Sequence, residues 1–258
     1  MKLILTIILS LFLANHSYSM CSWSGVFVYP TTSSIKSNSW IILEGYASSQ
    51  PMIDSLNKGY TVYLESGSTK IPLRVEHVYK GSFRLTQAIL IPTKKLIIGK
   101  TYYLKIDNLN NTEKETLTKW NSDTRSHEPI SWLITDEMDT YSPELLELPK
   151  LIDKEYIRYG CGPAIHTIFK ILVKDKSDIL VKTQLVDLTN GQETTYFLTL
   201  DDSGLLNVGH GMCSGAFNYR DKGKCKIRFC LFDSSGNSYN IWTNWINFDS
   251  PNGELDFK

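Results

Sequence analysis

Cysteines are the residues of this sequence with the widest chemical range, because a thiol can form a disulfide, bind a metal or act as a nucleophile. The sequence has five of them, Cys21, Cys161, Cys213, Cys225 and Cys230. Five is an odd number, so at least one cysteine stays outside any disulfide within the chain. Four of them follow residue 160, which predicts that cross-linking is concentrated in the second half of the chain.

Cys213 lies in a glycine-rich segment, Gly209-His-Gly-Met-Cys-Ser-Gly. The spacing Gly211-x-Cys213-x-Gly215 has the form of a nucleophile elbow, but an elbow needs a helix after it, and the following residues are typical of a strand and a turn. The glycines indicate instead a tight, irregular loop that only glycine fits. We predict a disulfide between Cys213 in this loop and Cys161.

His210, Met212 and Cys213 in the same segment form a group of soft ligands. Imidazole, thioether and thiolate together suit copper, so a periplasmic copper-binding protein is one alternative. However, no CxxC or HxxxH spacing is present, and no two histidines are adjacent. We therefore predict neither a metal site nor a cofactor, and keep His210, Met212 and Cys213 as the alternative ligands.

The segment Tyr159-Gly-Cys-Gly-Pro-Ala-Ile-His around Cys161 resembles the nucleophile motif of papain-like, bacteriocin-processing cysteine peptidases. The resemblance implies that Cys161 begins a helix whose N-terminus stabilises the thiolate. A histidine and then an Asp or Asn would follow, and His210 and Asp233 occur in that order. The upstream Gln of that family is absent near Cys161. The peptidase with Cys161, His210 and Asp233 is therefore an alternative to a non-catalytic protein.

Trp242 and Trp245 are candidate ligand-binding residues, because exposed tryptophans serve as flat platforms for sugar rings. In a strand the two residues have opposite parity, which predicts that one of them faces outward. A glycan or a protein is therefore the expected kind of partner. The alternative interpretation is that both tryptophans pack in the core or at a sheet edge.

Residues 1–19 have the layout of a cleaved secretory signal peptide, with Lys2, an apolar stretch and small residues at Ser17 and Ser19. We expect a secreted or periplasmic protein with no transmembrane segment in the mature chain. The residues before Cys21 depart from a lipobox, so we do not expect lipid anchoring there. An oxidising compartment also favours disulfides.

Charge and composition exclude some classes of protein. The chain carries 27 Lys and Arg and 27 Asp and Glu, so it lacks the basic excess of a nucleic-acid-binding protein. Hydrophobic residues make up 42% of the 258 residues, which is ordinary for a globular protein and argues against global disorder. Composition alone does not indicate what the protein binds.

Runs of β-branched and aromatic residues separated by turns predict an all-β fold. In Lys70–Val78, Ile71, Leu73 and Val75 alternate with polar residues, as expected for a strand with one buried face. We predict one β-sandwich over residues 24–125 and a second, disulfide-containing one over residues 156–250. The acidic, proline-containing residues 126–155 are interpreted as a connection, with a helical turn at Glu144–Leu148.

Two short motifs resemble those of bacterial immunoglobulin-like domains of exported proteins. Leu96-Ile-Ile-Gly-Lys-Thr-Tyr-Tyr-Leu-Lys-Ile, after Pro92, is similar to their penultimate strand, and Leu231-Phe-Asp-Ser-Ser-Gly-Asn is similar to the turn after the corresponding strand. The resemblance implies two tandem immunoglobulin-like β-sandwiches, in which a buried Tyr and aliphatic residues fill the space between sheets. Such domains serve as spacers, adhesins or carbohydrate-binding appendages, so we expect a non-catalytic binding or structural protein.

Overall fold

The structure is a computed structural model that describes residue 21 and residues 24–121, 124–136 and 138–252. The predicted signal peptide, residues 1–19, lies outside these residues. The fold is all-β, as predicted, with short helices only. No helix in the described part of the chain is long and apolar enough to cross a membrane.

For the description we divide the chain into an N-terminal half, residues 24–136, and a C-terminal half, residues 138–252. The elements of the N-terminal half are β1 (Gly25–Tyr29), β2 (Ser34–Lys36), β3 (Ile41–Tyr46), η1 (Ala47–Ser49), α2 (Gln50–Asp54), β4 (Val62–Ser66), β5 (Thr69–Lys80), β6 (Leu85–Pro92), β7 (Thr101–Ile106), α3 (Asn111–Thr116), β8 (Thr118–Asn121), β9 (Ser126–Pro129) and β10 (Ser131–Asp136). Those of the C-terminal half are β11 (Glu144–Leu145), β12 (Lys150–Tyr159), β13 (Gly162–Lys170), β14 (Val173–Lys174), β15 (Ile179–Asp187), β16 (Glu193–Thr199), β17 (Leu205–His210), β18 (Lys224–Asp233) and β19 (Ile246–Asp249).

The long strand β5 joins the two layers of the N-terminal half. Its first residues, up to Pro72, pair with β4, and its residues from Leu73 onwards pair with β6, with a register shift between Val75 and His77. A bulge of this kind bends a strand and increases its twist. The full strand order is β1-β3-β6-β5-β4-β7-β10-β2, with β2 parallel to β10.

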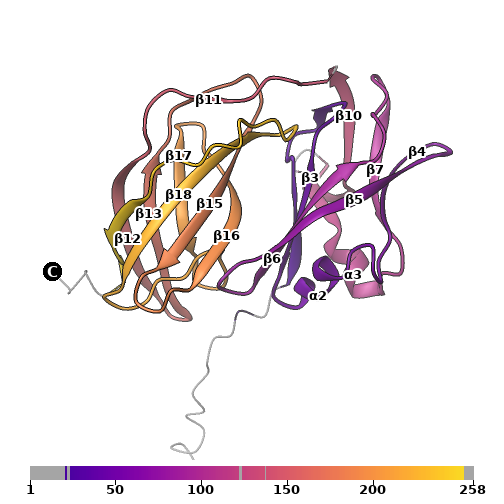
Figure 1. The fold of residues 1–258 in the computed structure, drawn as a ribbon. Coiled ribbons are helices and arrows are strands. Elements are labelled where there is room, and N and C mark those ends of the chain that lie inside the picture. The colour runs from indigo at the N-terminus through magenta and orange to yellow at the C-terminus, as the bar shows by residue number, and fades with distance from the viewer. Residues whose placement is uncertain (1–20, 22–23, 122–123, 137, 253–258) are drawn as a thin grey trace, which may run out of the picture.

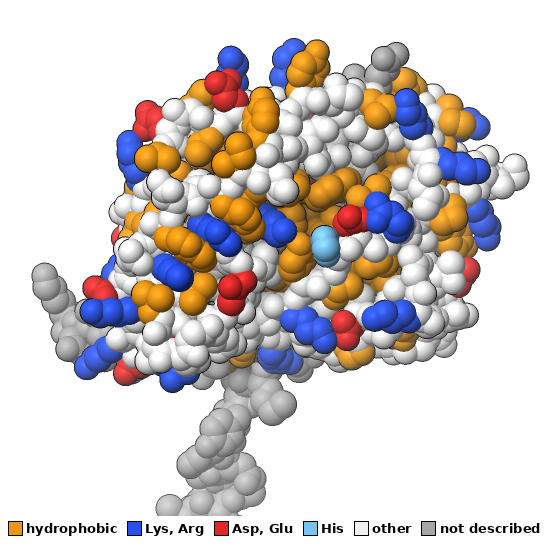
Figure 2. Space-filling view, viewed as in Figure 1, with side chains coloured by type: hydrophobic (Ala, Val, Ile, Leu, Met, Phe, Trp, Pro, Cys, Tyr) orange, Lys and Arg blue, Asp and Glu red, His pale blue; other side chains and the backbone are white. Residues whose placement is uncertain are grey.

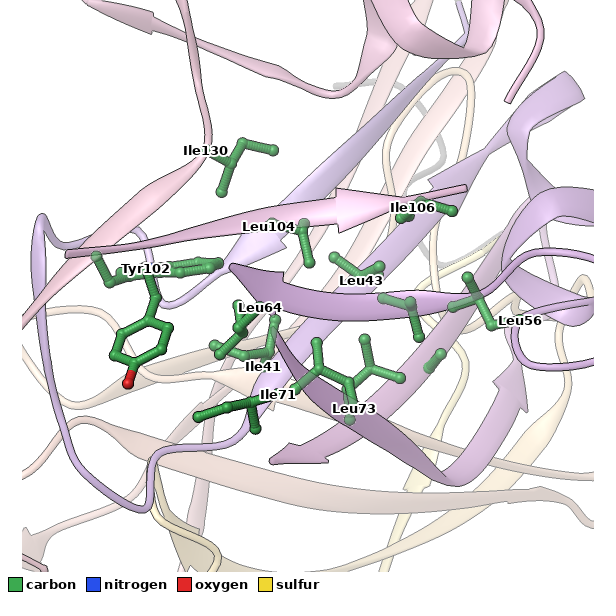
Figure 3. Packing of buried hydrophobic residues seen from close by; sticks show 14 of the residues in the cluster. Ile41, Leu43, Leu56, Leu64, Ile71, Leu73, Tyr102, Leu104, Ile106 and Ile130 are labelled. Carbon is green, nitrogen blue, oxygen red and sulfur yellow. The ribbon is translucent and has the colours of Figure 1, made fainter. Parts of the chain in front are cut away.

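Apolar side chains from both layers of the N-terminal half meet in one core (Figure 3). Tyr102, the tyrosine of the penultimate-strand motif, is fully buried, and its hydroxyl accepts a hydrogen bond from the Ile97 amide at 3.3 Å. Trp132 is equally buried and donates from Nε1 to the Pro30 carbonyl at 3.0 Å. Both large side chains thus have a partner for their polar atom, as burial requires.

The C-terminal half has a three-stranded sheet, β12-β13-β17, and a four-stranded sheet, β16-β15-β18-β19. Phe169 from the first sheet packs edge-on against Phe229 from the second, with ring centroids 5.1 Å apart. In both halves the first, second and fifth of the main strands share one layer. The fourth, third, sixth and seventh form the other layer, in that order, when β2 and the β8–β9 hairpin of the N-terminal half and the β11–β14 pair of the C-terminal half are set aside.

Strands occupy much of the predicted connection 126–155. β10 adds to the N-terminal sheet, and β12 is an edge strand paired along its length with β13. β12 carries the charges that suggested a linker, and such charges are typical of exposed edge strands. The predicted helical turn at Glu144–Leu148 is wrong, because Glu144 and Leu145 form the short strand β11, which pairs with β14.

The two halves lie side by side and share a buried interface (Figure 1). Ile42 and Ile89 from the N-terminal half pack with Leu180 and Phe197 from the C-terminal half. The indole of Trp40 extends this contact, with its centroid 6.2 Å from that of Phe197. Tyr46 and Leu85 also belong to the core of the C-terminal half. The apolar contact therefore runs across the boundary between the halves.

Candidate functional site

Cys213 is bonded to Cys21 and not to Cys161, so the predicted Cys161–Cys213 disulfide is wrong. The Cα atoms of Cys21 and Cys213 are 5.6 Å apart, within the usual range for a disulfide. The Arg84 guanidinium holds Cys21 in place by donating to its carbonyl at 3.3 Å. Cys161 lies in the turn between β12 and β13 and is half-buried. No local pattern could indicate the correct pair, because the two cysteines are 192 residues apart.

Cys225 and Cys230 lie inside the protein. Both are almost fully buried, and burial raises the pKa of the Cys225 thiol to about 11. Because the thiolate is the reactive form, this sulfur stays unreactive near neutral pH. Burial also raises the pKa of the Cys230 thiol, and the contact with Ser238 opposes that rise only in part. These two residues act as small core side chains.

The peptidase residues Cys161, His210 and Asp233 are not brought together. Cys161 precedes the strand β13, whereas the peptidase resemblance implies a helix at this position. His210 is the last residue of β17, which begins just after the turn that follows β16. Asp233 pairs with Ile179, beside the end of β16. The turn after β16 leads from there to the start of β17 in the facing sheet. Six residues of strand, on the order of 15 Å, therefore separate the Asp233 end from the His210 end.

His210 and Asp233 are each engaged locally. The His210 ring packs against Phe83 with centroids 5.2 Å apart, and its Nδ1 lies 2.8 Å from the Gly211 carbonyl oxygen. One Asp233 carboxylate oxygen accepts the amide protons of Ser235 and Asn237, closing the predicted turn. Both side chains thus have structural contacts of their own.

The alternative copper set loses one of its three ligands. The sulfur of Cys213 is already bonded to Cys21, so it cannot supply a thiolate to a metal. His210 is nearly buried against Phe83. The predicted cluster of His210, Met212 and Cys213 is therefore not available as a three-ligand site, because the loop is part of a cross-link.

Trp242 and Trp245 lie on the same side of the sheet, so the expectation from strand parity is wrong. Residues 238–245 do not form a regular strand, although Thr243 bonds to β18, donating its amide to the Phe229 carbonyl at 2.8 Å. The Arg228 guanidinium lies 4.6 Å from the ring centroid of Trp242 and 4.5 Å from that of Trp245. Both rings are half-buried against this cation.

Two lysines extend this arrangement across the outer side of the sheet. Lys226 Nζ lies 4.6 Å from the Trp245 centroid, and Lys182 Nζ lies 5.7 Å from that of Trp242. Alternation along β18 explains the placement, because Cys225, Ile227 and Phe229 point into the core while Lys226 and Arg228 point outward. We call Lys182, Lys226, Arg228, Trp242 and Trp245 the cationic face.

The cationic face is organised by hydrogen bonds as well as by ring contacts. Arg228 donates from Nε to the Gln184 side-chain oxygen, and Gln184 donates to the Glu193 carboxylate. Within the described residues, no carboxylate forms an ion pair with Lys182, Lys226 or Arg228. Figure 2 shows Lys and Arg side chains interleaved with hydrophobic ones over this part of the molecule. The face therefore presents cations held against aromatic rings.

A second polar cluster, which the sequence did not predict, joins the halves at the other end of their interface. The Lys36 ammonium donates to Asp139 and, at 2.8 Å, to Ser177. Burial raises the pKa of Asp139, but hydrogen bonds from Lys36 and Ser177 outweigh it and hold the pKa at about 2. Carboxylate oxygens of Asp175 and Asp233 lie within 4.8 Å of that of Asp139.

The sequence placed Asp139 in an acidic run that is typical of a solvated surface. Its partners Lys36 and Ser177 come from distant parts of the chain, so no local pattern could reveal the cluster. The ammonium of Lys36 already supplies a positive charge to Asp139. We therefore interpret the cluster as a structural contact between the halves.

Glu44 is a carboxylate enclosed between the halves. The Tyr196 hydroxyl donates to it at 2.9 Å and the Gln87 amide at 3.3 Å. Burial raises the pKa of Glu44, and the hydrogen bonds from Tyr196 and Gln87 oppose that rise only in part. Gln87 also bonds in both directions to the backbone of Phe197. Polar and apolar contacts thus alternate across the interface.

Comparisons with known proteins give no family. No family model and no curated protein matches the sequence. A pullulanase from Anoxybacillus sp. LM18-11 complexed with maltotriose aligns over 86% of this chain and 25% of its own, with 13% identity and a TM-score of 0.25. The type I pullulanase of Bacillus subtilis str. 168 complexed with maltose aligns over 87% and 24%, with 14% identity and a TM-score of 0.25.

A cytokine receptor complex aligns over 88% of this chain and 96% of its own, with 8% identity and a TM-score of 0.26. The chain spans about a quarter of the length of the two pullulanases. Scores this low establish neither a shared fold nor a shared activity.

Proposed function

We propose that this chain is an exported, non-catalytic binding or structural protein of two tandem immunoglobulin-like domains, with a glycan or a protein as its partner. The observation that carries the proposal is the strand order common to both halves, with the same three strands in one layer and the same four in the other. Sandwiches of this kind position binding surfaces on a rigid scaffold. The buried Tyr102 fits the same class of domain.

Export is supported by two features. The residue pattern of the first 19 positions is that of a signal peptide, and the Cys21–Cys213 disulfide suits an oxidising compartment. That disulfide also uses the sulfur that lipid anchoring at Cys21 would need. The absence of catalysis is supported by the separation of Asp233 from His210 and by the strand that follows Cys161.

Binding and cleavage are tested in the same samples. The mature chain would be passed over immobilised polysaccharides and extracellular proteins with surface plasmon resonance as the readout, while soluble peptides and glycans are analysed for products by mass spectrometry. We expect saturable binding with no product, and the same behaviour for Cys161→Ala. Products formed by the wild type and abolished in Cys161→Ala would replace the proposal with the peptidase.

A further inference from the structure

The cationic face concentrates positive charge in a chain that is neutral overall. Lys and Arg equal Asp and Glu in number, yet three cations gather on the outer side of β15 and β18. A carboxylate on that side, Glu193, is engaged by Gln184. Lys224, further along β18, lies opposite Asp249 of β19 in the register and is set aside. The unbalanced charge is therefore that of Lys182, Lys226 and Arg228.

The spacing of these cations follows the strand. Lys226 and Arg228 are two residues apart on β18, which is about 7 Å. Lys182 on β15 is the register partner of Cys230, which lies two residues after Arg228 on β18. The three cations thus form a row of regular steps along the sheet. A linear ligand with anionic groups at repeated intervals is complementary to such a row.

The two tryptophans add aromatic surface to the row of cations. Trp242 and Trp245 lie against Arg228 and the two lysines, and cation–π contacts of this kind restrain both partners. A cavity of about 310 Å³ also borders Trp242, but it is lined by apolar residues such as Leu148 and Ile241 and by none of the three cations, so it is not part of the cationic face. Aromatic and apolar surface beside cations suits a ligand that carries both ring faces and negative charge. Sugar rings with sulfate or carboxylate groups combine the two.

We propose that the cationic face binds an acidic polysaccharide, one with sulfate or carboxylate groups along its chain. The inference rests on the proposed binding function and narrows the partner from glycans in general to polyanionic ones. The anionic groups pair with Lys182, Lys226 and Arg228, and the sugar rings contact Trp242 and Trp245. Because the contacts are ionic and are made at the surface by half-buried cations, the affinity falls as salt rises.

The test compares polymers that share a backbone. Isothermal titration calorimetry of the full chain would use dextran sulfate against neutral dextran, polygalacturonate as the carboxylate polymer, and polyglutamate as a polyanion without sugar rings. We expect binding to dextran sulfate or polygalacturonate that weakens with salt, no binding to dextran, and weaker binding to polyglutamate. Equal binding of polyglutamate and the acidic polysaccharides would overturn the assignment to a glycan.

Variants locate the site. Lys182→Gln with Lys226→Gln is expected to weaken binding about tenfold, while the exposed pair Lys94→Gln with Lys95→Gln removes the same charge from the N-terminal half and stays within about twofold. Trp242→Ala should weaken binding and Trp242→Phe should restore part of it. Thermal unfolding by circular dichroism would establish that each variant is folded. An equal loss for both lysine pairs would contradict the placement on this face.

The outcomes separate the inference from the function on which it rests. If the chain binds a neutral glycan or a protein with saturation and binds no acidic polysaccharide, the cationic face is not a polysaccharide site, and the proposed binding function stands. If an acidic polysaccharide is bound and also cleaved, the non-catalytic function is wrong.

Discussion

The sulfur of Cys21 is bonded to that of Cys213, which ties the start of the described chain to the loop after β17. At this end of the interface Phe83 and Gly215 also exchange two backbone hydrogen bonds, one of 3.1 Å and one of 2.9 Å. The chain itself crosses between the halves at the opposite end, near Lys36 and Asp139 (Figure 1). The two halves are therefore joined at both ends of their interface.

Removing the disulfide should lower the free energy of unfolding. We expect Cys21→Ser with Cys213→Ser to cost about 2–5 kcal/mol, because the bond restricts the unfolded chain over a long loop. Urea denaturation followed by tryptophan fluorescence would measure the change. Cys161→Ser, in the turn before β13, is the control, and a loss as large for Cys161→Ser as for the double variant would contradict the assigned pair.

Gly236 should be essential for docking of the halves. A Cβ at this position would lie 2.0 Å from the indole of Trp40, and the backbone φ of +82° already disfavours other residues. Gly191 has a similar φ of +73° with nothing within 4 Å of the added Cβ. We expect Gly236→Ala to destabilise by about 2 kcal/mol or more beyond Gly191→Ala. Equal thermal shifts for the two variants would show that Trp40 is not packed there.

Stability should depend on pH through Glu44, whose folded-state pKa is raised by burial. Below its ordinary pKa the carboxyl is protonated in both states. As pH rises to the raised pKa, the unfolded side chain ionises first and stability is lost. The gain in unfolding free energy from Glu44→Gln should therefore grow between pH 4 and pH 8. A difference that stays constant over this range, as measured by urea titrations, would contradict the burial of this carboxylate.

Asp139 should act in the opposite direction at acid pH. Its folded-state pKa of about 2 lies below the ordinary value of 3.8, so its contribution is complete above about pH 4 and is lost as pH falls towards 2. We expect Asp139→Asn to cost about 1–3 kcal/mol at pH 6 and much less at pH 2. Equal costs at both pH values would rule out the charged contact with Lys36.

Much of the fold could be predicted because alternation is a local signal. Ile71 and Leu73 are buried and Pro72 and Arg74 exposed, as their spacing indicated. The alternation ends at the bulge between Val75 and His77, within the part of β5 that pairs with β6. The predicted boundary at residue 156 falls inside β12, because β12 is an edge strand whose charged residues look the same in sequence as those of a linker.

The candidate site could be predicted only in part. Trp242 and Trp245 were named as candidate ligand-binding residues, but the expectation from strand parity failed because their segment does not form a regular strand. The role of Arg228 depends on pairing between segments that are not neighbours in the chain. The disulfide partner of Cys213 could not be predicted for the same reason, since a contact between residues 192 positions apart leaves no trace in local spacing.

The most direct test of the account is a disulfide map of the mature protein, prepared without reduction and analysed by mass spectrometry after proteolysis. We predict one linked peptide pair that contains Cys21 and Cys213. It would establish that a disulfide ties the start of the mature chain to the C-terminal half, and that the Cys213 sulfur is neither a metal ligand nor a nucleophile. A linked pair of Cys161 and Cys213, or a Cys213 that reacts with iodoacetamide before reduction, would contradict it.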